Sequence, residues 1–396
     1  MTIIKSAVKE DYDAILELGE YAFNYKLTDE QKSDRHWQMD QQKVFIIKDD
    51  KTIASKLHLL PLEVFFGEKK IKMGGIAGVA TWPEYRRLGH VGEMMKHSLQ
   101  TMKECGMNFS MLHPFSIPFY RKYGYELTNY QHTYEYDITK LTMQGKHIPG
   151  KVKRFKAEHF ESCKSELQRL YSRKAEHYTL LLEREDWWWE KRVLSPSSQM
   201  VLYFDDQGIA QGYMIAEMEK ELLNIEEFIY FSSDAFHKLL QWVSQHDSMT
   251  GQVKLMMLPD DLDAYYFADP RGKESSHAYF MSRIVDVASF ISEYPFINEG
   301  MDATFYLNVT DDHAHWNEGT WKWEVKEGNT VNFERVATEA EVPSISCTIN
   351  TLTAILTGAL TIEKAVFMHS LNGDEAQLSR LGALIQPKPP AFLDFF

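Results

Sequence analysis

The sequence predicts an α+β fold divided into three domains. Most of its apolar residues fall in short β-rich runs separated by turn signals, which is typical of antiparallel strands. A few longer segments carry apolar residues at helical spacing instead. Strands of this kind with a few interspersed helices are characteristic of the α+β class. The chain has 396 residues, too many for one ordinary core.

The first predicted domain spans residues 1–145. A strand-like start is followed by residues 9–23, whose apolar side chains have helical spacing, and by a polar stretch that suits a second helix. Residues 43–81 then form a long β-rich region with the turn signals KDDKT and FGEKK, which predict hairpins. A helix after the RRLGH turn and a strand at 107–112 come next.

The first domain ends with a short helix and two strands. The helix is predicted at 116–123, and residues 124–129 and 132–138 are predicted to form a strand pair. The loop that follows, 142–151, marks the domain border.

The second predicted domain spans residues 146–284. It has helices at 158–175 and 185–194 and a hairpin at 199–221. This order repeats that of the first domain, so we interpret the segment as a diverged duplicate. No arginine-glycine turn precedes its next helix, 234–246, and we expect the duplicate to have lost any ligand loop.

The third predicted domain spans residues 285–396. Three strand-like segments lead to a helix at 347–360. Prolines at 387, 389 and 390 precede an apolar tail, residues 391–396. Proline stiffens a chain, and the phenylalanines of the tail could anchor it.

Charge and composition exclude several classes of protein. The net charge of −14 argues against nucleic acid or an anionic membrane as the main partner and favours a cationic one. No apolar run is long enough to span a bilayer, and the N-terminus lacks the features of a signal peptide. The three cysteines form no metal-ligand spacing, and no metal is expected. We therefore expect a cytoplasmic protein.

The segment EYRRLGH suggests a site for an anion. The helix after it begins near His90, so its free amides and the positive end of its dipole face this turn. Gly89 lets the backbone approach a ligand closely, and Arg86 and Arg87 add positive charge. These features suit a phosphate or diphosphate. The residues alone leave open a simple helix cap.

Two other phosphate-binding patterns fit less well. The glycines of GGIAGVA precede the end of a strand, whereas a dinucleotide-binding turn follows one. No Gly-Lys-Ser/Thr sequence is present, which excludes a Walker loop.

Residues 74–95, GGIAGVATWPEYRRLGHVGEMM, resemble the acetyl-CoA signature of GCN5-related N-acetyltransferases (GNAT). Val91 departs from it, because the pattern has a small residue there. Together with SIPFYRKYGYEL, the chain length and the aromatic tail, the whole chain resembles the enhanced intracellular survival group of that family. The resemblance implies two GNAT domains, the second degenerate, and a sterol-carrier-protein-like domain. It also implies acetyl-CoA as co-substrate, a homo-oligomer (a hexamer) and amines such as aminoglycosides as acceptors.

The resemblance also implies roles for individual residues. Val79, Ala80 and Thr81 would line the pantetheine arm. The diphosphate would be held by the loop residues Arg86, Arg87, Leu88, Gly89, His90, Val91 and Gly92. Phe115 and Ser116 would contact the cofactor further along. Tyr120 would be the general acid, and the carboxylate of Phe396 the general base.

The chemistry of both groups sets conditions. Proton transfer from a tyrosine of pKa about 10 to a thiolate of pKa about 8.5 is slightly unfavourable. Tyr120 would therefore act mainly by hydrogen bonding to the thiolate. The residues alone equally allow Tyr120 to be part of an aromatic packing cluster. A carboxylate of pKa about 3.5 becomes a useful base for an ammonium only if it is buried or acts through water. The tail could equally complete the core of its own domain.

Three further residues are candidates for the substrate pocket. Phe23 and Trp37 could form its walls, and Asp394 could attract a cation; core packing or a solvated surface explains each equally well. The sequence thus predicts transfer of acetyl from acetyl-CoA to an amine of a small cationic molecule by direct attack. Two alternatives stay open: an acetyltransferase acting on protein or peptide lysines, and a non-catalytic lipid- or acyl-binding protein.

Overall fold

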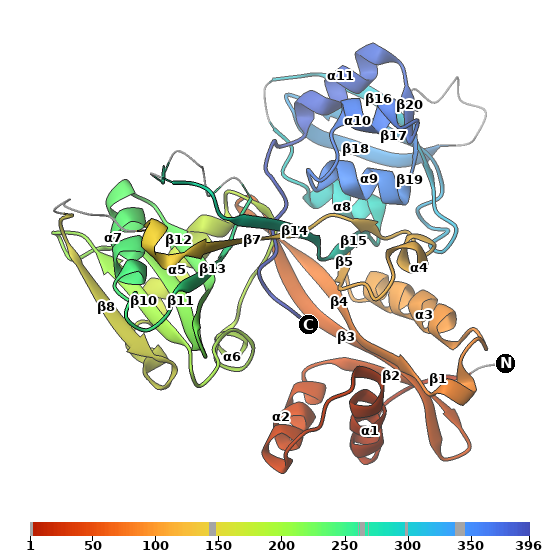
Figure 1. Ribbon diagram of the computed structural model, residues 1–396. Coiled ribbons are helices and arrows are strands. Elements are labelled where there is room, and N and C mark those ends of the chain that lie inside the picture. The colour runs from red at the N-terminus through yellow and green to blue at the C-terminus, as the bar shows by residue number, and fades with distance from the viewer. Residues whose placement is uncertain are drawn as a thin grey trace. The chain divides into compact units, whose positions relative to one another are not determined.

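The structure, a computed structural model, describes residues 3–141, 148–259, 261, 266–267, 269–297, 300–336 and 345–396. The chain forms two compact units. Unit 1 comprises Met1–Thr128, Phe280–Lys388 and Phe396, and unit 2 comprises Asn129–Tyr279 and Pro389–Phe395. Each unit contains both strands and helices (Figure 1).

The first sheet of unit 1 has the strand order β1-β2-β3-β4-β5-β15-β6. Its strands are β1 Ile4–Ser6, β2 Lys43–Asp49, β3 Thr52–Phe66, β4 Lys69–Thr81, β5 Phe109–Leu112, β6 Glu126–Leu127 and β15 Met281–Ile284. The β2–β3 and β3–β4 pairs are antiparallel hairpins, whereas β4 and β5 are parallel. The hairpins confirm the interpretation of the two turn signals.

Helices cover both faces of this sheet. They are α1 Tyr12–Phe23, α2 Asp29–Asp40, α3 His90–Glu104, α4 Ile117–Arg121 and α8 Val287–Glu293. Along β2, Val44 and Ile46 belong to the core beneath α1 and α2, whereas Phe45 and Ile47 belong to the core beneath α3. This alternation follows from the two-residue period of a strand and separates two apolar layers.

A second sheet in unit 1 follows α8. Its strand order is β18-β17-β16-β19-β20, with β16 Ala303–Thr310, β17 Gly319–Lys326, β18 Asn329–Val336, β19 Ile345–Thr348 and β20 Leu371–Gly373. Its helices are α9 Ile349–Leu356, α10 Ile362–Phe367 and α11 Glu375–Leu384. Trp323 packs against Phe305 with ring centroids 5.2 Å apart, and both are buried in the core of this third domain.

Unit 2 contains one sheet with the order β14-β7-β13-β12-β11-β10-β8. The strands of the unit are β7 Tyr130–Asp137, β8 Lys151–Lys156, β9 Thr179–Leu182, β10 Gln199–Phe204, β11 Ala210–Glu219, β12 Leu222–Tyr230, β13 Gln252–Met257 and β14 Lys273–Ala278, and its helices are α5 Lys164–Ala175, α6 Asp186–Trp188 and α7 Ser233–Ser244. Along β10, Val201 and Tyr203 face one core and Met200 and Leu202 the other. Unit 2 therefore repeats the two-layered build of the first sheet.

Two strands lie in other sheets than their place in the chain suggests. β7 pairs with β13 and β14 of unit 2, so the expected strand pair with residues 124–129 does not form. β15 pairs with β5 and β6 of unit 1, although residues 281–284 lie inside the segment assigned to the second domain. Apolar patterning predicts that a strand forms but not which strand it pairs with, and this explains why the expected pair was wrong. The predicted border between residues 145 and 146 lies outside the described residues.

The helices of the described residues are short or polar. None is both long and apolar enough to cross a membrane.

Candidate active site

Strand β4 separates from its parallel neighbour within unit 1. The ladder between β4 and β5 ends at the pair Ile76–Leu112, whereas β4 continues to Thr81. Gly78 adopts φ +55°, and the register with β3 shifts beside it, which marks a bulge. Residues 77–79 become half-buried beyond the last pair. The opened strand can therefore offer backbone groups on this side to a ligand.

The end of β4 includes three residues predicted to contact the cofactor. Val79 is half-buried, Ala80 is buried under α1, and the Thr81 hydroxyl is buried with no hydrogen-bond partner among the described residues. All three follow the last β4–β5 pair, as expected for a splayed strand. An unpaired buried hydroxyl at the open end of a strand is suited to meet a polar group.

The loop between β4 and α3 has the backbone of an anion site. Gly89, the N-cap of α3, adopts φ +84° and has no side chain to cap the helix. The first bond of the helix runs from the amide of Glu93 to the carbonyl of Gly89, so the amides of His90, Val91 and Gly92 precede it. A Cβ added to Gly89 would meet no atom within 4 Å, so there is open space beside the turn. The geometry fits a diphosphate.

Some side chains of this loop bond to the rest of the protein, and others are exposed to solvent. His90 Nδ1 lies 2.9 Å from Ser55 Oγ, and the His90 ring stacks on Tyr85, which ties the turn to β3. Arg86 Nε donates to the Thr81 carbonyl at 3.4 Å. Arg87, with φ +65°, and Leu88 are exposed. Arg87 is therefore the arginine more available to an anion.

Tyr120 is buried at the C-terminal part of the short helix α4. Its ring packs edge-on against Phe119 and Phe115, with centroids 5.2 and 5.4 Å away. Burial raises the pKa of Tyr120, and Tyr125 and Tyr123 add smaller effects. The phenol therefore keeps its proton at neutral pH and is suited to donate a hydrogen bond.

Phe115 and Ser116 precede α4. Phe115 is 73% exposed although its ring also contacts Phe119. Ser116 is the N-cap residue of α4 and is half-buried. An exposed aromatic ring beside Tyr120 is available to a ligand, and contact of Phe115 and Ser116 with the cofactor stays a prediction.

Phe396 packs onto the centre of β4 within unit 1. Its ring lies 5.0 Å from the ring of Phe280, and a Cβ on Gly75 would come within 2.9 Å of Phe396 Cε2. Phe396 is 7% exposed. Gly75 pairs with Met111 one residue before the β4–β5 ladder ends. The terminal phenylalanine is therefore held beside the opening of the strands.

The structure corrects the prediction for Asp394. Its side chain is buried within unit 2, where Arg184 Nε donates to both carboxylate oxygens at 2.9 and 3.1 Å. Trp188 Nε1 donates to the same carboxylate at 2.7 Å. A buried carboxylate that is already paired with Arg184 and bonded to Trp188 is not exposed to a substrate cation, so Asp394 anchors the tail.

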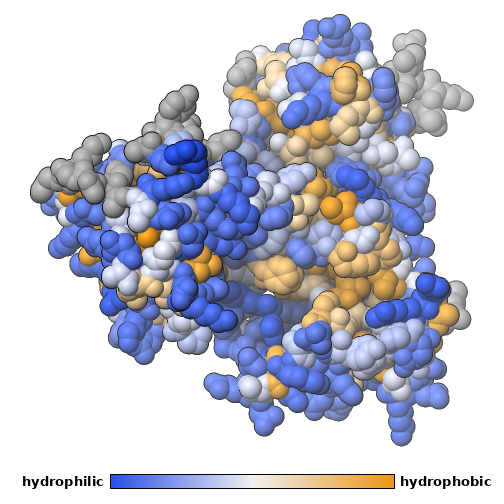
Figure 2. Space-filling view, viewed as in Figure 1, coloured by the Kyte–Doolittle hydropathy of each residue, from blue (hydrophilic) through white to orange (hydrophobic). Residues whose placement is uncertain are grey.

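Phe23 and Trp37 stay candidates for the substrate pocket. Phe23 ends α1 and is 51% exposed, and Trp37 in α2 is 38% exposed. On the face drawn in Figure 2, hydrophobic residues gather over the part of unit 1 where Figure 1 labels β3, β4 and α3. Unit 1 thus combines an apolar surface with the loop described above.

Unit 2 differs from unit 1 at the corresponding helix. The N-cap of α7 is Ser232, whose hydroxyl accepts from the amide of Ala235. In α3 the equivalent position is Gly89, and the amides are left to a ligand. The serine hydroxyl thus takes up one of the free backbone amides at the start of α7, so that this amide is not available to a ligand. This arrangement fits the loss of a ligand loop in the second domain.

One acidic cluster in unit 2 bears on metal binding. Carboxylate oxygens of Glu217, Glu219 and Glu226 lie within 4.8 Å of one another. Burial, together with the neighbouring carboxylates, raises the pKa of Glu226 to about 7. The structure gives no further reason to place a metal there, and the absence of a metal requirement stays a prediction.

Family models match three parts of the chain. Residues 3–128 and residues 180–284 each match a model described as an acetyltransferase (GNAT) domain. Residues 287–393 match a model described as a sterol carrier protein domain. The chain therefore has tandem GNAT acetyltransferase domains followed by a sterol-carrier-type domain, and it is an acetyl-CoA-dependent acyltransferase.

Several solved structures are similar over the whole length. A conserved protein of unknown function from Enterococcus faecalis, described as a probable N-acyltransferase, has 27% identity and a TM-score of 0.92, with all of both chains covered. A GCN5-related N-acetyltransferase from Anabaena variabilis has 21% identity and a TM-score of 0.87, again over all of both chains. Eis1 from Mycobacterium abscessus has 15% identity and a TM-score of 0.77 with the same coverage. No curated protein matches the chain.

Proposed function

We propose that the protein transfers the acetyl group of acetyl-CoA to an amine of a small cationic molecule, of the aminoglycoside type. The observation that carries the proposal is the uncapped N-terminus of α3 next to the splayed end of β4. A diphosphate at the first and a thioester along the second would bring the acetyl group into unit 1. The net charge of −14 favours a cationic acceptor.

The cofactor would be held mainly by backbone groups. Amides of the loop from Arg86 to Gly92 would bind the diphosphate, with the exposed Arg87 as the main charge. The strand residues Val79, Ala80 and Thr81 would line the pantetheine arm, and Phe115 and Ser116 would contact it further along. A strand amide near Val79 is suited to stabilise the oxyanion.

The transfer itself would need two proton movements. The amine nitrogen attacks the thioester carbonyl carbon, the C–S bond breaks, and the thiolate leaves. We propose that the Phe396 carboxylate accepts the proton from the amine and that the Tyr120 hydroxyl stabilises the thiolate by a hydrogen bond. Because the pKa of Tyr120 is raised, proton transfer to the sulfur would be late or completed by solvent.

The proposal extends to the acceptor pocket, the assembly and the location of the protein. Phe23 and Trp37 would form walls of the acceptor pocket. Resemblance to the enhanced intracellular survival group supports a homo-oligomer, a hexamer, which sedimentation velocity would measure. The three free cysteines suit a reducing compartment, and we propose the cytoplasm.

Thiol release from acetyl-CoA tests the proposal. We expect turnover with aminoglycosides and none with lysine peptides, whereas acetylation confined to peptides would contradict the small-amine acceptor.

Replacing Arg86 and Arg87 by alanine should raise the KM for acetyl-CoA, and unchanged kinetics would remove the diphosphate assignment. One glycine added after Phe396 should lower kcat, and full activity would exclude its carboxylate as the base.

A further inference from the structure

The segment that follows Tyr120 is tied back to Tyr120 itself. The amides of Tyr123 and Tyr125 both donate to the carbonyl of Tyr120, at 2.9 and 3.3 Å. The Tyr125 hydroxyl lies 2.7 Å from Ser110 Oγ, which in turn donates to the Gly74 carbonyl of β4. The position of Tyr120 therefore depends on the backbone of residues 121–125.

The third domain holds these residues through Asn350. Its side-chain amide, in the first turn of α9, donates to the carbonyl of Arg121 at 3.0 Å and to that of Tyr125 at 2.8 Å. Arg121 is the last residue of α4. A single side chain thus satisfies two carbonyls that flank the turn after Tyr120.

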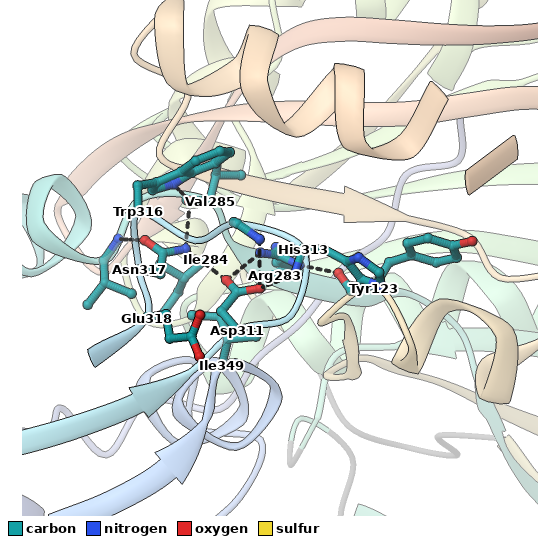
Figure 3. A network of polar contacts seen from close by, with 12 residues as sticks. Tyr123, Arg283, Ile284, Val285, Asp311, His313, Trp316, Asn317, Glu318 and Ile349 are labelled. Atoms are coloured by element: carbon teal, nitrogen blue, oxygen red, sulfur yellow. Dashed lines mark hydrogen bonds and ion pairs between the residues drawn. The ribbon is translucent and has the colours of Figure 1, made fainter. Parts of the chain in front are cut away.

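A buried ion pair makes a further connection, which Figure 3 shows. Arg283 of β15 donates to the carbonyl of Tyr123 and, at 2.5 Å, to Asp311 of the third domain. Both side chains are buried, 0% and 1% exposed. Asp311 also accepts from Asn317 Nδ2 at 2.9 Å, and Asn317 accepts from the amide of Val287.

Close packing accompanies these bonds. The ring of Tyr123 stacks on His313 of the third domain, with centroids 4.8 Å apart. Gly124 has φ +80°, and a Cβ there would collide with Arg283 and lie 2.8 Å from Ile349. The turn after Tyr120 is therefore held by contacts from β15 and from the third domain.

From these contacts we infer that the sterol-carrier-type domain positions Tyr120, with Asn350 as the main positioning residue and the Arg283–Asp311 pair as its support. The inference rests on the proposed role of Tyr120. A hydrogen-bond donor to a leaving thiolate must be held in place to be effective, and a displacement of about 1 Å lowers turnover strongly. The third domain then contributes to acetyl transfer without contacting substrate.

Asn350→Leu tests the inference, because leucine keeps the size and removes both donors. We expect kcat to fall about tenfold while the KM for acetyl-CoA stays within twofold. Asn308→Leu is the matched control: among the described residues its side-chain amide donates to Thr320 Oγ1 of the third domain, and the change should leave kcat within twofold. Unchanged kcat in a folded Asn350→Leu variant would overturn the inference.

A double variant separates positioning from other effects. If Asn350 acts through Tyr120, the double variant with Asn350→Leu and Tyr120→Phe should have nearly the same kcat as the Tyr120→Phe single variant. An equal loss in both backgrounds would overturn the inference. Wild-type turnover of Tyr120→Phe would remove the acid role, and the positioning role with it. A slow Tyr120→Phe enzyme beside a fully active Asn350→Leu enzyme would refute the positioning alone.

A second variant covers the case in which Asn350→Leu does not fold. His313→Leu removes the stacking on Tyr123 from a half-buried side chain. A severalfold lower kcat, lost in the Tyr120→Phe background, would support the inference. Unchanged turnover would contradict it.

Discussion

Lys56 is a buried cation in the first domain. It lies in β3 opposite Ala80, is 3% exposed, and its ammonium approaches Gly19 of α1 so closely that a Cβ there would lie 2.8 Å from it. Burial lowers the pKa of Lys56 to about 8, and Arg35 adds a smaller effect. The unfolded chain binds this proton more tightly than the folded one, so the group destabilises the fold at neutral pH.

Replacing Lys56 by methionine should therefore stabilise the protein. We expect the free energy of unfolding at pH 7 to rise by about 2–3 kcal/mol, and the gain to shrink as the pH rises from 8 through 10.5. Urea unfolding at pH 7 and pH 9 would measure it. Lys72→Met, at an exposed position of β4, is the control and should change stability little at either pH. A destabilised Lys56→Met protein would show that the ammonium has a favourable partner.

Alanine variants of Gly124 and Gly106 separate the effect of close packing on stability from the effect of backbone strain. Both have positive φ, +80° and +67°, but a Cβ on Gly106 would meet nothing within 4 Å. Gly124→Ala should lower the free energy of unfolding by about 1–3 kcal/mol more than Gly106→Ala does, because the new methyl collides with Arg283. It should also reduce kcat. Equal effects of the two changes on denaturant midpoints would argue against the collision.

At the scale of elements, β4 contacts the ring of Phe396 at Gly75 and separates from β5 just beyond it, where the cofactor is proposed to bind. Gly75→Ala would place a methyl 2.9 Å from the Phe396 ring and push the ring away. If the carboxylate of that residue acts as the base, kcat should drop severalfold with little change in the KM for acetyl-CoA. Gly251→Ala, which would meet nothing within 4 Å, should keep wild-type kinetics. An active Gly75→Ala enzyme would count against the base.

The tail segment is anchored in unit 2 by a network around Arg184. This side chain pairs with Asp394 and with Glu227, at 2.9 and 2.5 Å, and all three are buried. Asp394→Asn would leave Arg184 with less compensation, and we expect a loss of about 3–5 kcal/mol in unfolding free energy. Glu93→Gln removes an exposed pair with Lys96 and should cost about 0.5 kcal/mol or less. Comparable losses in the two variants, measured in urea, would contradict the anchoring.

Helices and hairpins could largely be predicted from local pattern, whereas pairing across the chain could not. The arginine-glycine turn and the start of the helix after it led to the loop, because both signals lie within a few residues. Asn350 and Arg283 could not be found this way, since nothing in their neighbourhoods indicates that they bond to residues after Tyr120. For Gly75 a signal existed in the paired glycines of GGIAGVA, but its partner lies at the far end of the sequence. Asp394 was misassigned because a sequence does not show which charge is buried.

At the scale of the whole molecule, binding of coenzyme A should raise the free energy of unfolding. If coenzyme A binds the folded chain at the α3 loop, a concentration of about 100 times its Kd should add about 2.7 kcal/mol of unfolding free energy. Thermal denaturation with and without coenzyme A would record the shift in Tm. The variant with Arg86 and Arg87 replaced by alanine should have a smaller shift at the same concentration. Equal shifts would place the cofactor elsewhere.

The position of β15 has a consequence for biosynthesis. The sheet that carries the loop lacks its strand between β5 and β6 until residues 281–284 leave the ribosome. At typical elongation rates the nascent first domain waits roughly ten to thirty seconds with an unpaired edge on β5. Unpaired edges invite aggregation. Expression yield should therefore depend on chaperones that shield growing chains, and a circular permutant that begins at Phe280, in which β15 is made before β5, should escape that dependence.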